Sequence, residues 1–197
     1  MGVFVGTIEV RFEQLVTLLP KFQSHAEKAI EEAAILIADA FAKGNKILIC
    51  GNGGSAADSQ HFAAEFVNAF SRKISRKALP AIALSTDTSV LTSIANDFTF
   101  DDVFSRQVEA YAIPGDVLVV LTTSGSSMNC IKAVASAKVL GVTSIAFSQE
   151  GAEISKLVDL CIEVPSDDTQ HIQECHILAY HVITELVEDN LFGDLKK

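Results

Sequence analysis

A histidine and a glutamate stand four residues apart in a segment that the sequence predicts to be helical. His61 and Glu65 therefore share one face of that helix, one turn apart. The residues between them are apolar, and a carboxylate in such surroundings needs a partner or a function. A carboxylate can act as a base and an imidazole as an acid, so together they can move a proton within a bound substrate. The pair is suited to acid–base chemistry of this kind.

The C-terminal segment carries further groups that could bind a ligand or move a proton. Residues 169–190 have helical spacing, and Gln173 and His181 lie on one slowly drifting i, i+4, i+8 ridge of that helix. These two residues could meet His61 and Glu65 around a divalent metal ion such as Zn²⁺, or around a substrate carbonyl. The same segment also contains His171, Glu174 and His176.

Two polar loops each follow a predicted strand and precede a predicted helix. The first, residues 51–58, reads Gly-Asn-Gly-Gly-Ser-Ala-Ala-Asp, and the second, residues 122–127, reads Thr-Thr-Ser-Gly-Ser-Ser. Glycines let the backbone approach an anion, a helix N-terminus offers unpaired N–H groups, and hydroxyls add neutral donors. A serine alone could simply cap a helix. Two such loops together favour a pocket for a small phosphomonoester, and for a phosphosugar in particular.

The first loop also fits G-x-G-x-x-A, the fingerprint of dinucleotide binding, so a nicotinamide-dependent dehydrogenase is an alternative. That interpretation requires an acidic residue about 20 positions later, at the end of the second strand. The first acidic residue after that strand is Asp87, which is 36 positions beyond Gly51. Neither loop contains the Gly-Lys-Ser/Thr of a nucleotide P-loop. The phosphosugar pocket is the better interpretation.

The elements that must position these groups alternate along the chain. Residues 8–43 predict a long helix that Gly44 ends. Continuously apolar runs such as residues 117–121 are typical of parallel strands covered on both faces. The predicted strands are residues 46–50, 81–84, 116–121, 143–147 and 160–164, and the predicted helices between and after them are residues 55–70, 88–111, 128–140, 153–157 and 169–190. We expect an α/β fold with a doubly wound, five-stranded parallel sheet of flavodoxin-like order 2-1-3-4-5. The whole chain, residues 1–197, then forms a single domain with residues 1–44 as an N-terminal helical extension.

The amino-acid composition limits which binding partners and which cellular compartment the protein can have. The chain has 15 Lys and Arg against 25 Asp and Glu, a formal charge of −10, which argues against nucleic-acid binding. No apolar run approaches the ~20 residues of a membrane span. The sequence begins without a secretory signal pattern, and its four scattered cysteines suit a reducing compartment, so we expect a cytoplasmic protein. A basic island at residues 71–77 is most simply an exposed loop, with anion binding as the alternative.

Taken together, these stretches resemble the SIS (sugar isomerase) domain family over essentially the whole chain. The stretches that carry the resemblance are residues 50–65, Asn96-Asp97, residues 104–108, residues 123–125 and Gln173-Glu174-x-His176-x4-His181. The resemblance implies isomerisation of sedoheptulose 7-phosphate to D-glycero-D-manno-heptose 7-phosphate, the first step toward the ADP-heptose of lipopolysaccharide. It also implies a cytoplasmic homotetramer with sites at subunit interfaces, in which the N-terminal extension serves in packing.

By position, the resemblance gives roles to individual residues. It implies that Glu65 is the base at the sugar carbon, that His181 is the proton donor, and that each subunit holds one Zn²⁺. The implied zinc ligands are His61, Glu65, Gln173 and His181. The implied substrate contacts are Asn52, Gly53, Gly54, Ser55, Glu65, Asn96, Asp97, Thr122, Thr123, Ser124, Ser127 and Gln173.

The chain departs from the family pattern at a few positions. The family often has Gly-Arg-Tyr or Gly-Arg-Phe where this chain has Asn68-Ala69-Phe70, which removes an arginine near the substrate. Arg72, three residues further on, could replace that arginine. Smaller departures are Thr122, Ser126 and His171. The departures bear on substrate preference more than on the type of reaction.

A second interpretation within the same family is a phosphosugar-binding regulator without catalysis. One non-catalytic relative, a replication-initiator-associating protein of similar length, is similar to this chain at Ala95-Asn96-Asp97 and at the Leu191-Phe192 ending. That relative lacks the full set of Glu and His residues, whereas this chain has Glu65 and His181. The sequence therefore favours the enzyme.

Overall fold

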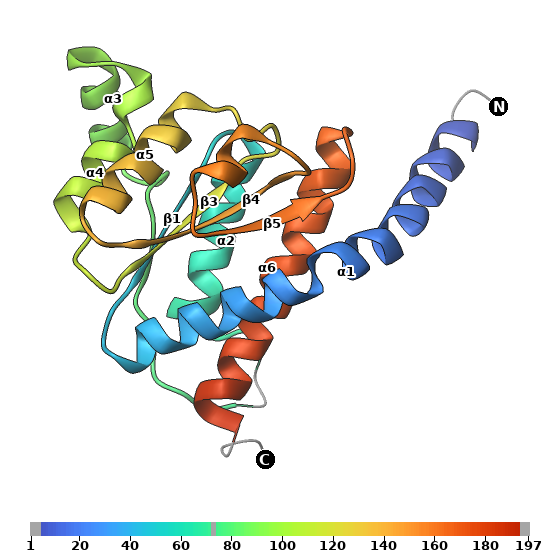
Figure 1. Cartoon of the computed structure of the whole chain (residues 1–197), viewed down its shortest axis with the longest axis horizontal. Helices are drawn as coiled ribbons and strands as arrows, with labels where there is room; N and C mark the ends of the chain where they lie inside the picture. The colour runs from blue at the N-terminus through green and yellow to red at the C-terminus, as the bar shows by residue number, and fades with distance from the viewer. Residues whose placement is uncertain (1–4, 72–73, 194–197) are drawn as a thin grey trace.

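A computed structural model describes residues 5–71 and 74–193 of the chain. Its centre is a parallel sheet whose five strands stand in the order β2-β1-β3-β4-β5, which confirms the predicted topology. The strands are β1 (Ile47–Gly51), β2 (Ala81–Ala83), β3 (Val117–Leu121), β4 (Thr143–Gln149) and β5 (Leu160–Val164). Helices lie on both faces of this sheet (Figure 1).

Strands β1 and β3 are buried at every residue, because helices cover both of their faces. Successive side chains point to opposite faces, so Ile47 and Ile49 enter one hydrophobic core while Leu48 and Cys50 enter the other. The continuous apolar runs in the sequence are the signature of this double burial.

Among the described residues, each face of the sheet is covered by three α-helices. The first layer consists of α1 (Val5–Ala42), α2 (Gly54–Val67) and α6 (Thr169–Phe192). The second consists of α3 (Thr88–Asp97), α4 (Ser105–Tyr111) and α5 (Met128–Val139). Two short 3₁₀ helices, η1 (Phe100–Asp102) and η2 (Glu153–Lys156), complete the described elements. The two helices that carry the predicted chemistry, α2 and α6, therefore pack on the same face.

Helix α1 is continuous through Pro20, and its N-terminal part projects away from the body of the molecule (Figure 1). Gly44, with φ of 82°, ends the turn after the helix in the left-handed conformation that the sequence predicts there. Large apolar side chains are exposed on the projecting part, at Ile8, Val10, Phe12 and Val16. Arg11 pairs with Asp168, the residue whose carboxylate caps the N-terminus of α6.

Two expectations from composition can be compared with the structure. Among the described residues, no helix is long and apolar enough to cross a membrane. All four cysteines are free thiols, as their spacing predicts.

The prediction of an exposed basic loop at residues 71–77 is wrong for Arg76. Its side chain is fully buried, because Glu188 of α6 lies beneath it and pairs with it. Arg72, which could replace the arginine missing at position 69, lies outside the described residues.

Candidate active site

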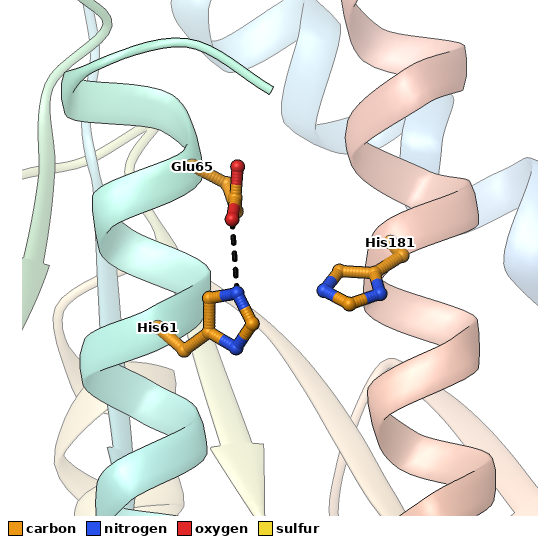
Figure 2. A group of neighbouring side chains, drawn as sticks. All are labelled: His61, Glu65 and His181. Atoms are coloured by element: carbon orange, nitrogen blue, oxygen red, sulfur yellow. Dashed lines mark hydrogen bonds and ion pairs between the residues drawn. The ribbon is translucent and has the colours of Figure 1, made fainter. Parts of the chain in front are cut away.

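His61 and Glu65 of α2 and His181 of α6 point toward one another across the space between the two helices (Figure 2). His61 Nε2 lies 2.9 Å from Glu65 Oε1, the distance of a hydrogen bond. One ligand atom from each of the three residues lies within 4.8 Å of the others. The sequence brings Glu65 and His61 together by helical spacing, and the packing of α6 on α2 adds His181.

The orientation of His61 is fixed from behind by Tyr180. The Tyr180 hydroxyl lies 2.9 Å from His61 Nδ1, and its ring stacks on Phe62 with centroids 4.9 Å apart. Burial, and then the negative charges of Asp58 and Glu65, raise the pKa of Tyr180, so the phenol stays protonated. A hydrogen bond to one imidazole nitrogen fixes the orientation of the ring and leaves the other nitrogen for a ligand. Tyr180 was not identified from the sequence.

The surroundings of His181 favour the neutral form of its imidazole. Burial lowers its pKa, the nearby His61 lowers it further, and Glu65 opposes both effects. The rings of His61 and His181 have centroids 5.0 Å apart. A neutral His181 has one nitrogen with a lone pair, which can bind a metal ion, and one N–H, which can donate a proton to a substrate oxygen.

Gln173 approaches the same region from α6 and is oriented by Asp58. Its Nε2 donates to Asp58 Oδ2 over 2.8 Å. A carboxylate only accepts hydrogen bonds, so the amide nitrogen faces Asp58 and Gln173 Oε1 is left as the free acceptor or ligand. The amide also lies against Gly54, where a Cβ would stand only 2.6 Å from it. A side chain at position 54 would therefore have to displace the Gln173 amide.

The two polar loops meet at one edge of the sheet, as expected for the carboxyl ends of neighbouring parallel strands. They enclose a cavity of about 60 Å³ lined by Asn52, Ser55, Leu121, Thr122, Thr123, Ser124 and Ser127. The first residues of both α2 and α5 lack a side-chain cap, so their N–H groups remain available to an anion. Ser55 and His61 are about 9 Å apart along the α2 axis. A sugar phosphate with its phosphate in this cavity can therefore extend to the His61–Glu65–His181 cluster.

Glycine and threonine shape the second loop. Gly125 has a φ of 63°, and a Cβ there would lie 2.3 Å from the Cβ of Ala152. The Gly125 N–H donates to Thr122 Oγ1 over 3.2 Å, so the Thr122 hydroxyl holds the loop together as well as lining the cavity. Ser124 Oγ accepts from both the N–H and the hydroxyl of Ser126.

A pair of asparagines joins the two loops. Asn52 Nδ2 donates to Asn129 Oδ1 over 2.9 Å, and Asn129 Nδ2 donates back to Asn52 Oδ1 over 2.8 Å. The Asn52 side chain is therefore occupied by the loop contact. Asn129 was missed by sequence reasoning, because nothing in the spacing of two residues 77 apart indicates that they pair.

Some candidates from the sequence lie elsewhere in the described chain. Asn96 and Asp97 are exposed at the end of α3, whose Ile94 packs in the core on the opposite face of the sheet. His171 lies 2.6 Å from Glu174 and 3.4 Å from Gln14 of α1, outside the cluster. The structure thus brings His61, Glu65 and His181 together in one cluster, and it brings the two loops together around the cavity.

His176 is a core residue. It is fully buried against Phe147, and neither ring nitrogen has a hydrogen-bond partner in the part of the chain that the structure describes. Burial lowers its pKa to about 4.

Residues 12–149 match the SIS domain family, so the fold and the site define a sugar isomerase domain. The chain belongs to this family, and within it to the phosphoheptose isomerases. It is 48% identical over 186 residues to phosphoheptose isomerase of Citrifermentans bemidjiense, covering 94% of this chain and 96% of the relative. It is 50% identical over 166 residues to that of Aquifex aeolicus, covering 84% and 85%.

A solved structure gives the same result. Phosphoheptose isomerase GmhA from Neisseria gonorrhoeae superposes with a TM-score of 0.88 at 38% identity, covering 93% of this chain and 98% of that one. The resemblance inferred from the sequence is confirmed. The chain belongs with the isomerases rather than with the nicotinamide dehydrogenases.

Proposed function

We propose that the chain converts sedoheptulose 7-phosphate to D-glycero-D-manno-heptose 7-phosphate. The observation that carries the proposal is the His61–Glu65–His181 cluster, which stands between α2 and α6 within reach of the paired phosphate loops. The name of the relatives that it matches supports the same reaction. The product would enter the cytoplasmic route to the ADP-heptose of lipopolysaccharide.

Glu65 is the proposed base of the reaction. Its carboxylate removes the proton from C1 of the ketose and returns it to C2, through an enediol in which the C1–C2 bond is double. His181, neutral because burial and His61 lower its pKa, takes and gives the proton that passes between the oxygens on these two carbons. Ser55, Thr123, Ser124 and Ser127 hold the phosphate with hydroxyls, together with the N–H groups that begin α2 and α5. Neutral donors of this kind explain how a protein with a charge of −10 can bind a phosphate.

The donor set fits Zn²⁺. Two imidazoles and a carboxylate are the ligands of many catalytic zinc sites, which leave further positions open. His61 and Glu65 are already in contact, and Tyr180 orients His61 as an outer partner does in such sites. We propose that His61, Glu65, His181 and Gln173 Oε1 hold one zinc per subunit. When bound, the metal would polarise the substrate oxygens.

We also propose that the working unit is a homotetramer of single SIS domains spanning residues 1–197. Exposed Ile8, Phe12 and Val16 on the projecting part of α1 form an apolar surface suited to burial against another copy. Asn96 and Asp97 are exposed at the end of α3, so they are accessible to a substrate or to a neighbouring copy. Residues 1–44 would then act as the extension used in packing.

An isomerase assay on sedoheptulose 7-phosphate tests the proposal. We expect the wild type to be active, Glu65→Gln and His181→Ala to lose at least 10²-fold in kcat, and the matched variant Glu185→Gln, an exposed carboxylate on α6, to keep full rate. Treatment with a chelator followed by zinc addition tests the metal separately. An inactive wild type in the presence of zinc would refute the enzyme. If it still bound the sugar phosphate, the chain would be a phosphosugar-binding regulator.

A further inference from the structure

Arg76 lies buried beside the candidate site, in contact with both helices that carry it. Its Nε lies 2.6 Å from Glu188 Oε1, and the two side chains are 0% and 1% exposed. Its Nη2 donates to the Glu65 carbonyl over 2.8 Å, and its Nη1 to the Phe66 carbonyl over 2.9 Å. These carbonyls belong to the last turn of α2, which has no helical donors of its own for them. Arg76 therefore joins the backbone of Glu65 to α6.

Glu188 makes a second connection, toward His181. Its Oε1 also accepts from the Phe70 N–H over 3.0 Å. The ring of Phe70 in turn packs against the ring of His181, with centroids 5.7 Å apart. Glu188 and His181 are two turns apart on the same face of α6. One carboxylate oxygen is thus linked to the backbone of the proposed base and to the ring beside the proposed proton donor.

Stability alone does not account for this arrangement. Buried ion pairs are often no more stabilising than apolar residues of the same volume, because two charges must leave water. Here, moreover, Glu188 Oε2 is buried without a hydrogen-bond partner among the described residues. What the pair provides is geometry, since the flat guanidinium donates in a fixed fork to Glu188 Oε1 and to the carbonyls of Glu65, Phe66 and Lys77.

We propose that Arg76 and Glu188 are positioning residues for the isomerisation. They hold the last turn of α2 and the ring of Phe70 so that Glu65 and His181 face the same sugar carbons. Neither residue touches the substrate, and both act through the groups they hold. The inference rests on the proposed function.

The test uses Arg76→Lys, which keeps the charge but loses the planar fork, in the full-length zinc-loaded protein. Because a misplacement of about 1 Å can cost on the order of 10²-fold, we expect kcat to fall roughly 10- to 100-fold. The phosphate loops are untouched, so KM and the inhibition constant of inorganic phosphate should stay within about twofold. Glu188→Gln keeps an acceptor for Phe70 and should lose less activity than Glu188→Leu.

Lys46→Met is the matched control. Lys46 Nζ lies 2.6 Å from Asp116 Oδ2, another buried carboxylate, but at the amino ends of β1 and β3, away from the site. Both variants should lower the melting temperature, and only Arg76→Lys should lower kcat.

The outcomes below separate failure of the positioning role from failure of the proposed function. If Arg76→Lys keeps the kcat of Lys46→Met, the positioning role is refuted and the proposed function stands. If Arg76→Lys does not fold, Glu188→Gln and Glu188→Leu decide, and equal kcat in these two refutes the role. If the wild type and Lys46→Met are both inactive with zinc present, the proposed function fails and the inference fails with it.

Discussion

Replacing Gly54 by alanine should lower the catalytic activity while leaving the stability of the fold almost unchanged. The new Cβ would stand 2.6 Å from the Gln173 amide, whereas ordinary contacts begin at 3.4 Å. The amide must therefore retreat by about 0.8 Å, which breaks its hydrogen bond to Asp58 and moves Oε1. The side chain that has to move is flexible, so the fold itself can accommodate the change.

The expected effect is small on stability and large on activity. Alanine is favoured over glycine in a helix by up to about 1 kcal/mol, and the lost hydrogen bond costs about the same amount. The melting temperature should therefore change by no more than a few degrees. A displaced zinc and sugar contact should lower kcat/KM by roughly 10- to 100-fold, or about 1.4 to 2.7 kcal/mol in the barrier.

A double-mutant cycle makes the prediction specific. In a Gln173→Ala background there is no amide to displace, so adding Gly54→Ala should cost little further activity. The measurements are kcat/KM on sedoheptulose 7-phosphate and thermal unfolding of all four proteins. Full activity of Gly54→Ala, or additive losses in the double variant, would show that the Gly54–Gln173 contact does not control the site.

Three further predictions follow from single contacts. Tyr180→Phe keeps the stacked ring but removes the hydroxyl that holds His61 Nδ1, so zinc affinity should fall at least about 10-fold in a competition titration with a chelating dye; unchanged affinity would remove Tyr180 from the site. Asn129→Ala unpairs Asn52 and loosens the two loops, so the inhibition constant of inorganic phosphate should rise several-fold, and an unchanged constant would contradict this role. His176 has a pKa of about 4, below its ordinary value of 6.5, so the unfolded state binds more protons and stability falls as the pH drops from about 6.5 toward 4. Between pH 7 and pH 5 this loss is about 2 kcal/mol, and urea unfolding of His176→Leu should lack that part of the pH dependence.

The topology and much of the site could be predicted from the sequence because they depend on local periodicity. Residues 117–121 are apolar without interruption because both faces of β3 are buried, and this identifies a central parallel strand. His61 and Glu65 are one turn apart on any helix, so their contact needs no tertiary information. The two loops then meet because β1 and β3 are parallel neighbours, so their carboxyl ends lie at the same edge of the sheet.

The contacts between helices could not be predicted in the same way, because they depend on how α6 is rotated and placed on α2. Arg76 illustrates this limit. Its three basic neighbours in the sequence indicate an exposed loop, yet its guanidinium is buried because Glu188, 112 residues later, pairs with it. The pairing of Asn52 with Asn129 is likewise a property of the folded sheet edge and has no local signal. The predicted end of the helix over residues 55–70 differs from the observed one for a related reason. Helix α2 ends at Val67, where Arg76 donates to a carbonyl of its last turn.

Tyr180 and His181 are consecutive residues, and both reach His61. Neighbouring side chains on a helix diverge by about 100°, so these two approach the imidazole from different sides. Any rotation of α6 about its axis that improved one contact would worsen the other. The contacts of His61 therefore depend on how α6 is rotated about its axis. The buried residues of α6, among them Cys175, Ala179 and Ile183, fix that rotation. A larger residue in place of Cys175 or Ala179 would rotate the helix and so disturb His61. The core under α6 is therefore less free to vary than its packing alone requires.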